Sequence, residues 1–378
     1  MSRTRQQRSV ITGSPRAVTY DPALLFSALF LVGIGVVMVY SASSALAMKK
    51  FGTDIYFLKK QALFSMMGIV LLVMCSHFPL KWYRALAYPS LFLAFGLLAC
   101  VKIPGIGITA GGSSRWLQLG SFNFQPSEFA RLALVLYLAY SLSKKQALIK
   151  DFAVGFIPHI IVLGIFAILL LTQPDFGSVV IFCAIAWVMM FVAGVRLTHL
   201  VGTFMLALPV GYWFVMNADY RMNRWISFLN PWDYPVEGGY QIIHSQMAFG
   251  TGGIWGTGIG KGYQKLFYLP EPHTDFIFSV IGEELGLIGV VVVLVLYAVI
   301  LARGIRIARR APDTFSSLTA LGITTAIGLH VCINMGVTLG MLPTKGLTLP
   351  FLSYGGTSLL INMMSIGILI NIGAASER

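Results

Sequence analysis

The segment 268–289 reads YLPEPHTDFIFSVIGEELGLIG and joins a polar, proline-broken approach to a long apolar helix. The approach ends at Asp275, and the apolar run that follows continues to Ala302. That run is 27 residues long, whereas about 20 residues are enough to cross the hydrocarbon core of a membrane. The first turns, which carry Glu283 and Glu284, are therefore surplus length or lie in a wet cavity.

Asp275 thus lies where a watery loop turns into a membrane helix, and two interpretations of it are open. A carboxylate at that boundary touches both water and lipid, which suits an enzyme that acts on a lipid-linked polar substrate. Aspartate is also a favoured residue at the N-cap of a helix. The residue type alone supports a cap at least as well as a catalytic base.

The composition indicates the fold class. Of 378 residues, 57% are hydrophobic and only 11% are charged, which is too apolar for an average soluble domain. Apolar runs of about 20 residues recur along the chain, so we expect an all-α integral membrane protein. The cysteines lie inside these runs and are interpreted as small packing residues instead of disulfides or metal ligands; they are Cys75, Cys100, Cys183 and Cys332.

The formal net charge is +13, but the basic residues sit in short loops between apolar runs. Membrane orientation explains them better than nucleic acid does, so no nucleic-acid partner is expected. The segments assigned to the inner side hold 15 of the 27 Lys and Arg, but only four of the 14 Asp and Glu. We therefore expect both termini in the cytoplasm, with residues 1–21 as an N-terminal tail.

Ten membrane helices are predicted within a single domain, 22–378. The first is interpreted as an uncleaved membrane helix, because its apolar run is longer than that of a usual signal peptide. The predicted helices cover residues 22–42, 61–76, 84–101, 126–142, 152–171, 177–193, 199–216, 276–302, 315–338 and 357–374.

The loop 217–275, placed on the periplasmic side, has 59 residues and is by far the longest. Loops of that length are usually functional or disordered, and three tryptophans in this one favour order against the membrane. Tyr240, Ile243 and Met247 predict one face of a short interfacial helix.

Ionisable groups inside membrane helices are expensive and are usually functional or paired. Glu128 and Arg131 share one helix face, Asp175 lies in a short turn, and His330 and Asn334 share a face of the ninth predicted helix. Apart from His330 and Asn334, which we expect to bond between helices, these groups and Glu283 and Glu284 map to the outer half. That position favours one shared outward-facing cavity, and structural pairing is an equally good explanation of each group alone.

Cations gather in the outer loops, where they suit either a substrate pyrophosphate or ordinary anionic lipid headgroups. They are Arg115, Arg221, Arg224, Lys261, Lys265 and Lys345. The glycine-rich run 250–262 lacks the spacing of nucleotide-binding loops, and we expect it to be a tightly turning loop whose backbone amides face phosphate. No cluster has zinc-site spacing, so no metal ligands are assigned.

Four stretches together resemble the SEDS family of shape, elongation, division and sporulation proteins. They are GGSSRWLQLGSFNFQPSEFARL at 111–132, QPDFG at 173–177, LPEPHTDFIFSVIGEELG at 269–286 and LPTKGLTLPFLSYGGTSLL at 342–360. The resemblance runs from about residue 20 to the end of the chain. Thr344-Lys345-Gly346 is more similar to the cell-division member of the family than to the elongation member.

The resemblance implies a ten-helix peptidoglycan glycosyltransferase that acts on lipid II at the outer face of the inner membrane, with a division-septum location. It places the essential carboxylate at Asp275, and Glu128, Asp175 and Lys345 also match family motif positions; Arg131 stands where lysine is common. It implies a class B penicillin-binding protein as the transpeptidase partner, together with other divisome proteins and membrane lipids.

The chemistry expected of such a site needs one base and a cationic clamp, because a pyrophosphate leaves without a proton donor, unlike the alkoxide in glycoside hydrolysis. Candidate substrate-binding residues are Arg115, Glu128, Arg131, Asp175, Arg221, Arg224, Lys261, Glu271, His273, Glu283 and Lys345. A divalent cation, Mg²⁺ or Mn²⁺, at the pyrophosphate is chemically reasonable, and no other cofactor is expected. The rival interpretations are a lipid II flippase and a scaffold that only recruits a synthase.

Overall fold

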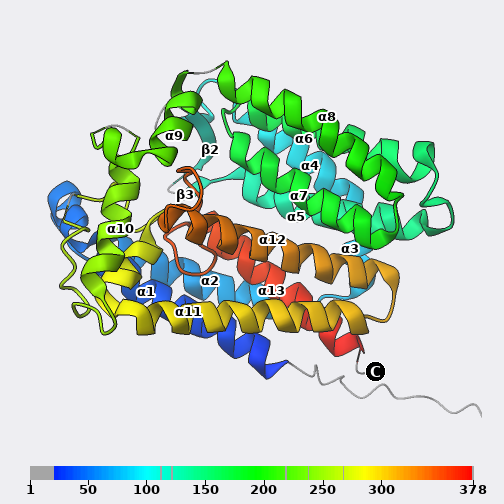
Figure 1. The fold of residues 1–378 in the computed structure, drawn as a ribbon. Helices are drawn as coiled ribbons and strands as arrows, with labels where there is room; N and C mark the ends of the chain where they lie inside the picture. The colour runs from blue at the N-terminus through cyan, green and yellow to red at the C-terminus, as the bar shows by residue number, and fades with distance from the viewer. Residues whose placement is uncertain are drawn as a thin grey trace, which may run out of the picture.

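The computed structural model describes residues 21–110, 113–120, 122–217, 219–236, 238–266 and 268–376. It is a bundle of long, roughly aligned helices whose C-terminus lies at one end, while the strands and the short helices α9 and α10 gather at the other (Figure 1). The expected tail, 1–21, lies outside the described residues except for Asp21.

The helices of the bundle and its loops are α1 (Pro22–Phe51), α2 (Tyr56–His77), α3 (Leu80–Ala85), α4 (Ala87–Cys100), α5 (Pro126–Lys144), α6 (Ile157–Leu171), α7 (Phe176–Ala193), α8 (Leu197–Met216), α9 (Asp219–Leu229), α10 (Tyr240–Gly252), α11 (Ile277–Arg310), α12 (Thr314–Thr338) and α13 (Gly356–Ser376). Short 3₁₀ helices, η1 (Gln146–Leu148) and η3 (Pro231–Asp233), and a π-helical turn, η2 (Phe152–Phe156), complete the helical elements of the described chain.

Each of the ten predicted membrane helices corresponds to a helix of the structure. Within the described residues, eight helical segments are long and apolar enough to cross a membrane. The other two counterparts are shorter or less apolar: α4 has 14 residues because the chain bends at Leu86, and α5 carries Glu128 and Arg131 near its start. The all-helical membrane fold is therefore confirmed, and the helix predicted over 84–101 is divided between α3 and α4.

Helix α11 is broken at Gly286, whose φ of 62° and ψ of −163° are not helical. A Cβ at this position would lie 2.4 Å from the backbone nitrogen of Gly256, so only glycine fits the close approach. The amide freed by the break, that of Leu287, donates to the carbonyl of Gly253 at 2.9 Å. The segment 287–310 is about 36 Å long at the usual helical rise, enough to cross a membrane, so the preceding turns are surplus length.

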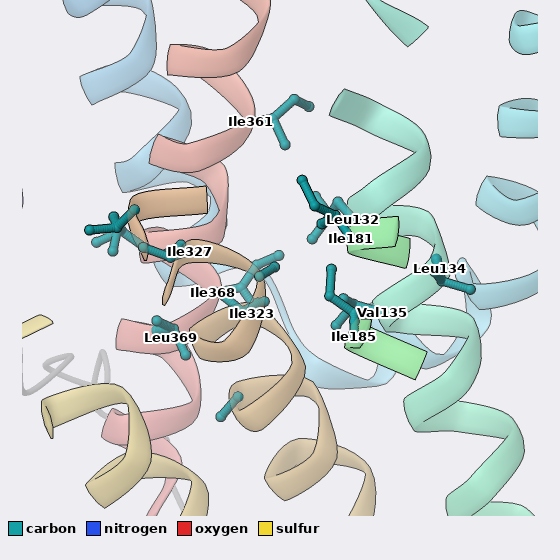
Figure 2. Close-up of a cluster of buried hydrophobic side chains, with 14 of the residues drawn as sticks. Leu132, Leu134, Val135, Ile181, Ile185, Ile323, Ile327, Ile361, Ile368 and Leu369 are labelled. Carbon is teal, nitrogen blue, oxygen red and sulfur yellow. The ribbon is translucent and has the colours of Figure 1, made fainter. Parts of the chain in front are cut away.

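The core lies where α5, α7, α12 and α13 meet. Ile323 and Ile327 of α12 face Leu132 and Val135 of α5, with side chains of α7 and α13 around them (Figure 2). The close approach of α12 depends on Gly322, where a Cβ would lie 2.6 Å from a methyl group of Val135. This packed region holds the helices that carry the polar groups described below.

The end of the bundle away from the C-terminus, which we call the outer end, contains a three-stranded antiparallel sheet that the sequence analysis did not predict. Its strands are β1 (Gly107–Ala110), β2 (Ser113–Leu119) and β3 (Phe122–Phe124), in the order β1-β2-β3. The Thr357 hydroxyl at the start of α13 donates to the carbonyl of Asn123 at 3.2 Å. The sheet is thereby fixed over the bundle.

The long loop 217–275 is ordered by α9 and α10. The short helix expected there exists as α10, but its buried residues include Ile243, whereas Met247 is exposed. The Ser245 hydroxyl donates to the carbonyl of Thr338 at the end of α12, at 2.5 Å. The expected interfacial face is therefore wrong in detail, because α10 packs against α11 and α12.

Candidate active site

Asp275 lies in the turn that precedes α11, and its side chain does not cap that helix. The N-cap residue is Phe276, which provides no side-chain hydrogen bond either. Burial and the charge of Glu271 raise the pKa of Asp275 to about 7, against the opposing charges of Arg115 and Arg224. The side chain is nevertheless partly exposed, so the turn holds a carboxyl group at a surface.

The turn that carries Lys345 faces the turn that carries Asp275. A Cβ at Gly346 would lie 2.8 Å from Oδ2 of Asp275, so the glycine allows the two turns to touch. The Lys345 Nζ is buried and has no hydrogen-bond partner among the described residues. Burial lowers the pKa of Lys345 to about 8, against the opposing charge of Asp175. A buried ammonium without an acceptor beside a carboxylate is well suited to receive an anion.

Helix α7 makes room for Lys345 through Gly177. A Cβ there would stand 1.7 Å from the ε-carbon of Lys345, a distance that no packing allows. The neighbouring Asp175 caps α7, accepting from the Ser178 amide at 3.3 Å and from its hydroxyl at 2.6 Å. Asp175, predicted to bind substrate, therefore has a structural task beside Lys345.

Two arginines reach the same region from separate elements. Arg115 of β2 donates to the carbonyl of Pro174 at 2.5 Å and lies 4.0 Å from Asp175. Arg224 of α9 donates to the carbonyl of Thr344 at 3.3 Å. The outer sheet, α9 and the Lys345 turn thus bring three cations into one region, where Arg115 and Arg224 act on the charge of Asp275 and Lys345 is acted on by the charge of Asp175.

A buried polar network lies on the helices themselves. Arg131 pairs with Glu128 at 3.0 Å, contacts the ring of His330 at 2.7 Å and donates to Asn362 at 3.1 Å. The expected pairing of Glu128 with Arg131 and the expected helix-to-helix bond of His330 are both present. Asn334 instead bonds to two loops, as described below.

His273 and Glu271 precede Asp275 in the same turn. The His273 ring is buried, lies tilted at 48° against the Phe57 ring with 4.6 Å between centroids, and lies 3.7 Å from the exposed carboxylate of Glu271. Burial lowers the pKa of His273 to about 4, so the imidazole is neutral near pH 7. It therefore cannot serve as a cation for phosphate.

Glu283 is not placed for a substrate contact. It is buried and accepts from the backbone amide of Tyr263 at 2.7 Å and from that of Gln264 at 3.2 Å. We expected the glycine-rich run to present its amides to phosphate, but the amides that directly follow it bind this carboxylate. The role that the structure gives Glu283 is to hold the loop against α11.

Glu284 forms a second buried site beside it. It accepts from Lys265 Nζ and from the Ser41 hydroxyl, each at 2.6 Å, and from the Gly260 amide at 3.0 Å. Lys265 is thus a structural ion-pair partner. The polar groups of the outer half therefore form three groups in place of the single shared cavity expected from the sequence: the cluster at Asp275, the buried network of Glu128 and Arg131, and a loop-binding pair of glutamates.

Two further predicted cations lie apart from the Asp275 turn. The Arg221 guanidinium stacks on the Phe214 ring at 3.7 Å, and Lys261 is exposed in the glycine-rich loop. Their assignment to substrate stays a prediction. Sequence reasoning missed Gly177, although the glycine directly after Pro-Asp-Phe was a visible signal for a close approach. It also missed Ser353, whose hydroxyl donates to the carbonyl of Thr274 at 2.5 Å.

No group of three His, Cys, Asp or Glu side chains in the described portion of the chain has the geometry to hold a metal ion. Mg²⁺ at a phosphate usually takes only one or two protein carboxylates and completes its shell with substrate oxygens and water. Asp275 and the exposed Glu271 satisfy that smaller requirement in donor type.

A bundle of apolar helices with a cluster of buried charges at one end defines a multi-pass membrane protein with a polar site at the water boundary. The family model for FtsW, RodA and SpoVE, described as cell cycle protein, matches residues 22–378. The chain belongs to this family, the SEDS family of the sequence analysis.

Individual relatives agree with that assignment. A probable peptidoglycan glycosyltransferase FtsW of Geobacter metallireducens is 48% identical over 353 residues, which cover 93% of this chain and 94% of that protein. Stage V sporulation protein E of Bacillus subtilis is 42% identical over 357 residues, covering 94% and 98%.

Solved structures show the same fold. A chain of a peptidoglycan synthase complex, described as coordinating polymerization and crosslinking, is similar with a TM-score of 0.79 at 30% identity, covering 96% of this chain and 100% of that one. The rod shape determining protein RodA of Thermus thermophilus gives 0.71 at 30% identity, covering 95% and 98%.

Proposed function

We propose that this chain is a peptidoglycan glycosyltransferase that polymerises lipid II into β-1,4 glycan strands, with Asp275 as general base. Relatives at 48% and 47% identity carry the name peptidoglycan glycosyltransferase. The observation that carries the catalytic assignment is local: the Asp275 carboxylate makes no cap, and its turn touches the turn that carries Lys345, whose buried ammonium has no hydrogen-bond partner among the described residues.

The reaction follows from these groups. The ionised Asp275 takes the proton from the 4-hydroxyl of the acceptor's GlcNAc, and that oxygen forms a bond to the anomeric carbon of the donor sugar. The bond from that carbon to the pyrophosphate oxygen breaks, and the pyrophosphate keeps the electron pair. Lys345, Arg115 and Arg224 stabilise its growing charge. Attack opposite the leaving group inverts an α-linked donor and gives the β-linkage.

A divalent cation is part of the proposal as a companion of the pyrophosphate. Glu271 would hold it, which leaves the Asp275 carboxylate to accept the proton, and it would supply further neutralisation of the leaving group. The roles of Asp275, Lys345, Arg115 and Arg224 are assigned from their own contacts and not through this cation.

The deciding experiment measures glycan chains made by the purified protein from purified lipid II. Asp275→Asn retains nearly the same shape but cannot accept a proton at neutral pH, so chain formation should fall by about 10²–10⁴-fold. Thermal unfolding in the same detergent is expected to be unchanged. A folded Asp275→Asn protein that polymerises like the parent would refute the catalytic assignment.

The same preparation separates the rival activities. Lipid II transport in vesicles that persists in folded, polymerisation-dead Asp275→Asn would support flipping as a second activity. If the parent protein makes no glycan chains even when its partner is present, the scaffold interpretation would be supported.

We propose an inner-membrane location at the septum, with the Asp275 end in the periplasm and both termini in the cytoplasm. The basic bias of the inner loops supports this orientation. Val236 is 86% exposed in the long outer loop, and Ser376 ends α13. In a cysteine-free background, an impermeant thiol reagent should label Val236→Cys but not Ser376→Cys in spheroplasts; the reverse pattern would overturn the orientation.

We propose that a class B penicillin-binding protein packs its membrane helix on α11. The exposed residues Val291 and Val295 lie four apart on one face, whereas Val293 is buried in the chain's own core. Val295→Gln should therefore reduce co-purification of the transpeptidase, and Val192→Gln on α7, also exposed, is the matched control. Equal recovery of the complex with both variants would move the interface elsewhere.

A further inference from the structure

Three successive carbonyl groups at the start of α11 are each held from the other side of the site. The carbonyl of His273 accepts from the Tyr354 amide at 2.8 Å. The carbonyl of Thr274 accepts from the Ser353 hydroxyl at 2.5 Å. The carbonyl of Asp275 accepts from the Asn334 side chain at 2.9 Å. Each residue of the turn from His273 to Asp275 is thus held by a hydrogen bond to its backbone carbonyl.

Asn334 also holds the opposite turn. The same amide nitrogen of Asn334 donates to the carbonyl of Leu347 at 2.5 Å, two residues beyond Lys345. A primary amide is the neutral side-chain group that offers two N–H donors on one nitrogen, and here each donor reaches a different turn. The residue is buried, 1% exposed, near the outer end of α12, so water does not compete for these bonds.

Ser353 forms a second bridge of the same kind. Besides its bond to Thr274, its oxygen accepts from the Leu349 amide at 2.7 Å. The hydroxyl therefore joins the Asp275 turn to the chain that follows Lys345. Two side chains on separate elements link the same two turns, which lie about 70 residues apart in the sequence.

We propose that Asn334 and Ser353 are positioning residues that set the distance between the Asp275 carboxylate and the Lys345 ammonium. The proposal rests on the catalytic roles proposed above for that pair. Both residues bind backbone carbonyls. They therefore orient the Asp275 side chain without forming a hydrogen bond to its carboxylate. This explains how an aspartate directly before a helix avoids becoming its cap.

The test compares Asn334→Leu with a matched control at the other end of the bundle. Asn371 of α13 also donates to two carbonyls, those of Cys75 at 2.9 Å and Phe78 at 2.5 Å, but far from the Asp275 turn. Asn371→Leu should lower thermal stability and leave kcat and the pH profile unchanged. Asn334→Leu should lower kcat by about 10²-fold, as a displacement near 1 Å can, with a small change in KM.

The pH profile is the readout that a merely structural role would not move. Freeing the Asp275 turn changes the surroundings of its carboxylate, so the acidic limb of the kcat profile should shift in Asn334→Leu. Ser353→Ala should produce the same changes to a smaller extent, and Ser353→Thr, which keeps the hydroxyl, should restore them. If Asn334→Leu does not fold, Ser353→Ala and Ser353→Thr alone decide.

Unchanged kcat and acidic limb in folded Asn334→Leu and Ser353→Ala would overturn the proposal. So would an activity loss that Asn371→Leu reproduces at equal loss of stability. Asp275→Asn is measured in parallel: if it stays active, the proposed base is wrong. If it is inactive while Asn334→Leu is unaffected, only the positioning inference fails.

Discussion

Aspartates precede helices at both ends of the bundle, and they behave differently. At the inner end Asp21, Asp151 and Asp313 each accept a hydrogen bond from the amide three residues on, at 3.0–3.1 Å. Asp313 also pairs with Arg84 at 2.7 Å. At the outer end Asp275 makes no such cap, although it stands two residues before α11. Asp175, also at the outer end, caps α7, so Asp275 differs from a neighbour at its own end as well as from the capping aspartates of the inner end.

The capping aspartates raise the stability of the fold, whereas the ionised carboxylate of Asp275 lowers it. A capping carboxylate gains an N–H bond and a favourable helix dipole. Asp275 is only partly exposed and lacks these compensations, and burial raises its pKa to about 7 from the usual 3.8. Below about pH 4 the carboxyl group is neutral and the folded state does not bear this cost. The free energy of unfolding therefore decreases as the pH rises from about 4 through about 7. Such a cost is common where a carboxyl group has a chemical task.

After the loss expected for Asp275→Asn, the next largest effect is expected from the outer cation Lys345. Lys345→Met removes the buried ammonium, and loss of one group that stabilises developing charge typically lowers a rate by about 10²–10³-fold. Arg84→Met removes a cation of the inner end whose role is the pair with Asp313, and it should leave polymerisation unchanged. Polymerisation from lipid II measures both. Parent-like activity of folded Lys345→Met at every substrate concentration would remove the distinction between the two ends.

A smaller loss is expected from Gly177→Ala, because the added methyl group takes the place of the Lys345 ε-carbon. Displacing the ammonium without removing it should lower kcat by up to about 10²-fold. Gly304 of α11 is the control, since its Cβ would collide with the Thr324 hydroxyl at 2.2 Å at the inner end. Gly304→Ala should lower thermal stability and spare kcat; equal kcat losses in the two variants would assign both to general packing.

The helices were predictable because apolar runs of membrane length are a local signal. Asp275 and Lys345 came from motif positions, and the pairing of Glu128 with Arg131 followed from their spacing. The role of Glu283 did not, because its partners are backbone amides of Tyr263 and Gln264 about 20 residues earlier. Almost every residue has a backbone amide, so residue types do not show which amides will bind a carboxylate.

The cap-or-base question was open for a related reason. It depends on the backbone angles of the Asp275 turn and on carbonyl contacts from Asn334 and Ser353. Both donors lie far along the chain, so spacing could not reveal them. The break at Gly286 was equally hidden, because glycine is common inside membrane helices.

The pH dependence sharpens the comparison by a moderate factor. Asp275 must be ionised to accept a proton, so with its pKa at about 7 the rate should rise about fivefold from pH 6 to pH 7. Lys345 must be charged, and with its pKa at about 8 the rate should fall again above that pH. The initial rate across pH 5.5–9 measures both limbs. A flat profile over this range would contradict both assignments.

The smallest expected effect tests the comparison at its origin, on stability alone. Asp313→Ala removes a cap that α12 uses, in which one carboxylate oxygen accepts from the Ser316 amide and the other from its hydroxyl, each at 3.0 Å. Loss of such a cap should lower the free energy of unfolding by about 1 kcal/mol.

Asp275→Ala removes no cap, and above pH 7 it also removes a carboxylate that burial disfavours. Its unfolding temperature at pH 8 should therefore equal or exceed that of the parent, while at pH 4 the two proteins should unfold alike. If Asp275→Ala instead lost as much stability as Asp313→Ala, with both effects independent of pH, the carboxylate would be a cap after all. The contrast between the two ends would then lie only in their surroundings.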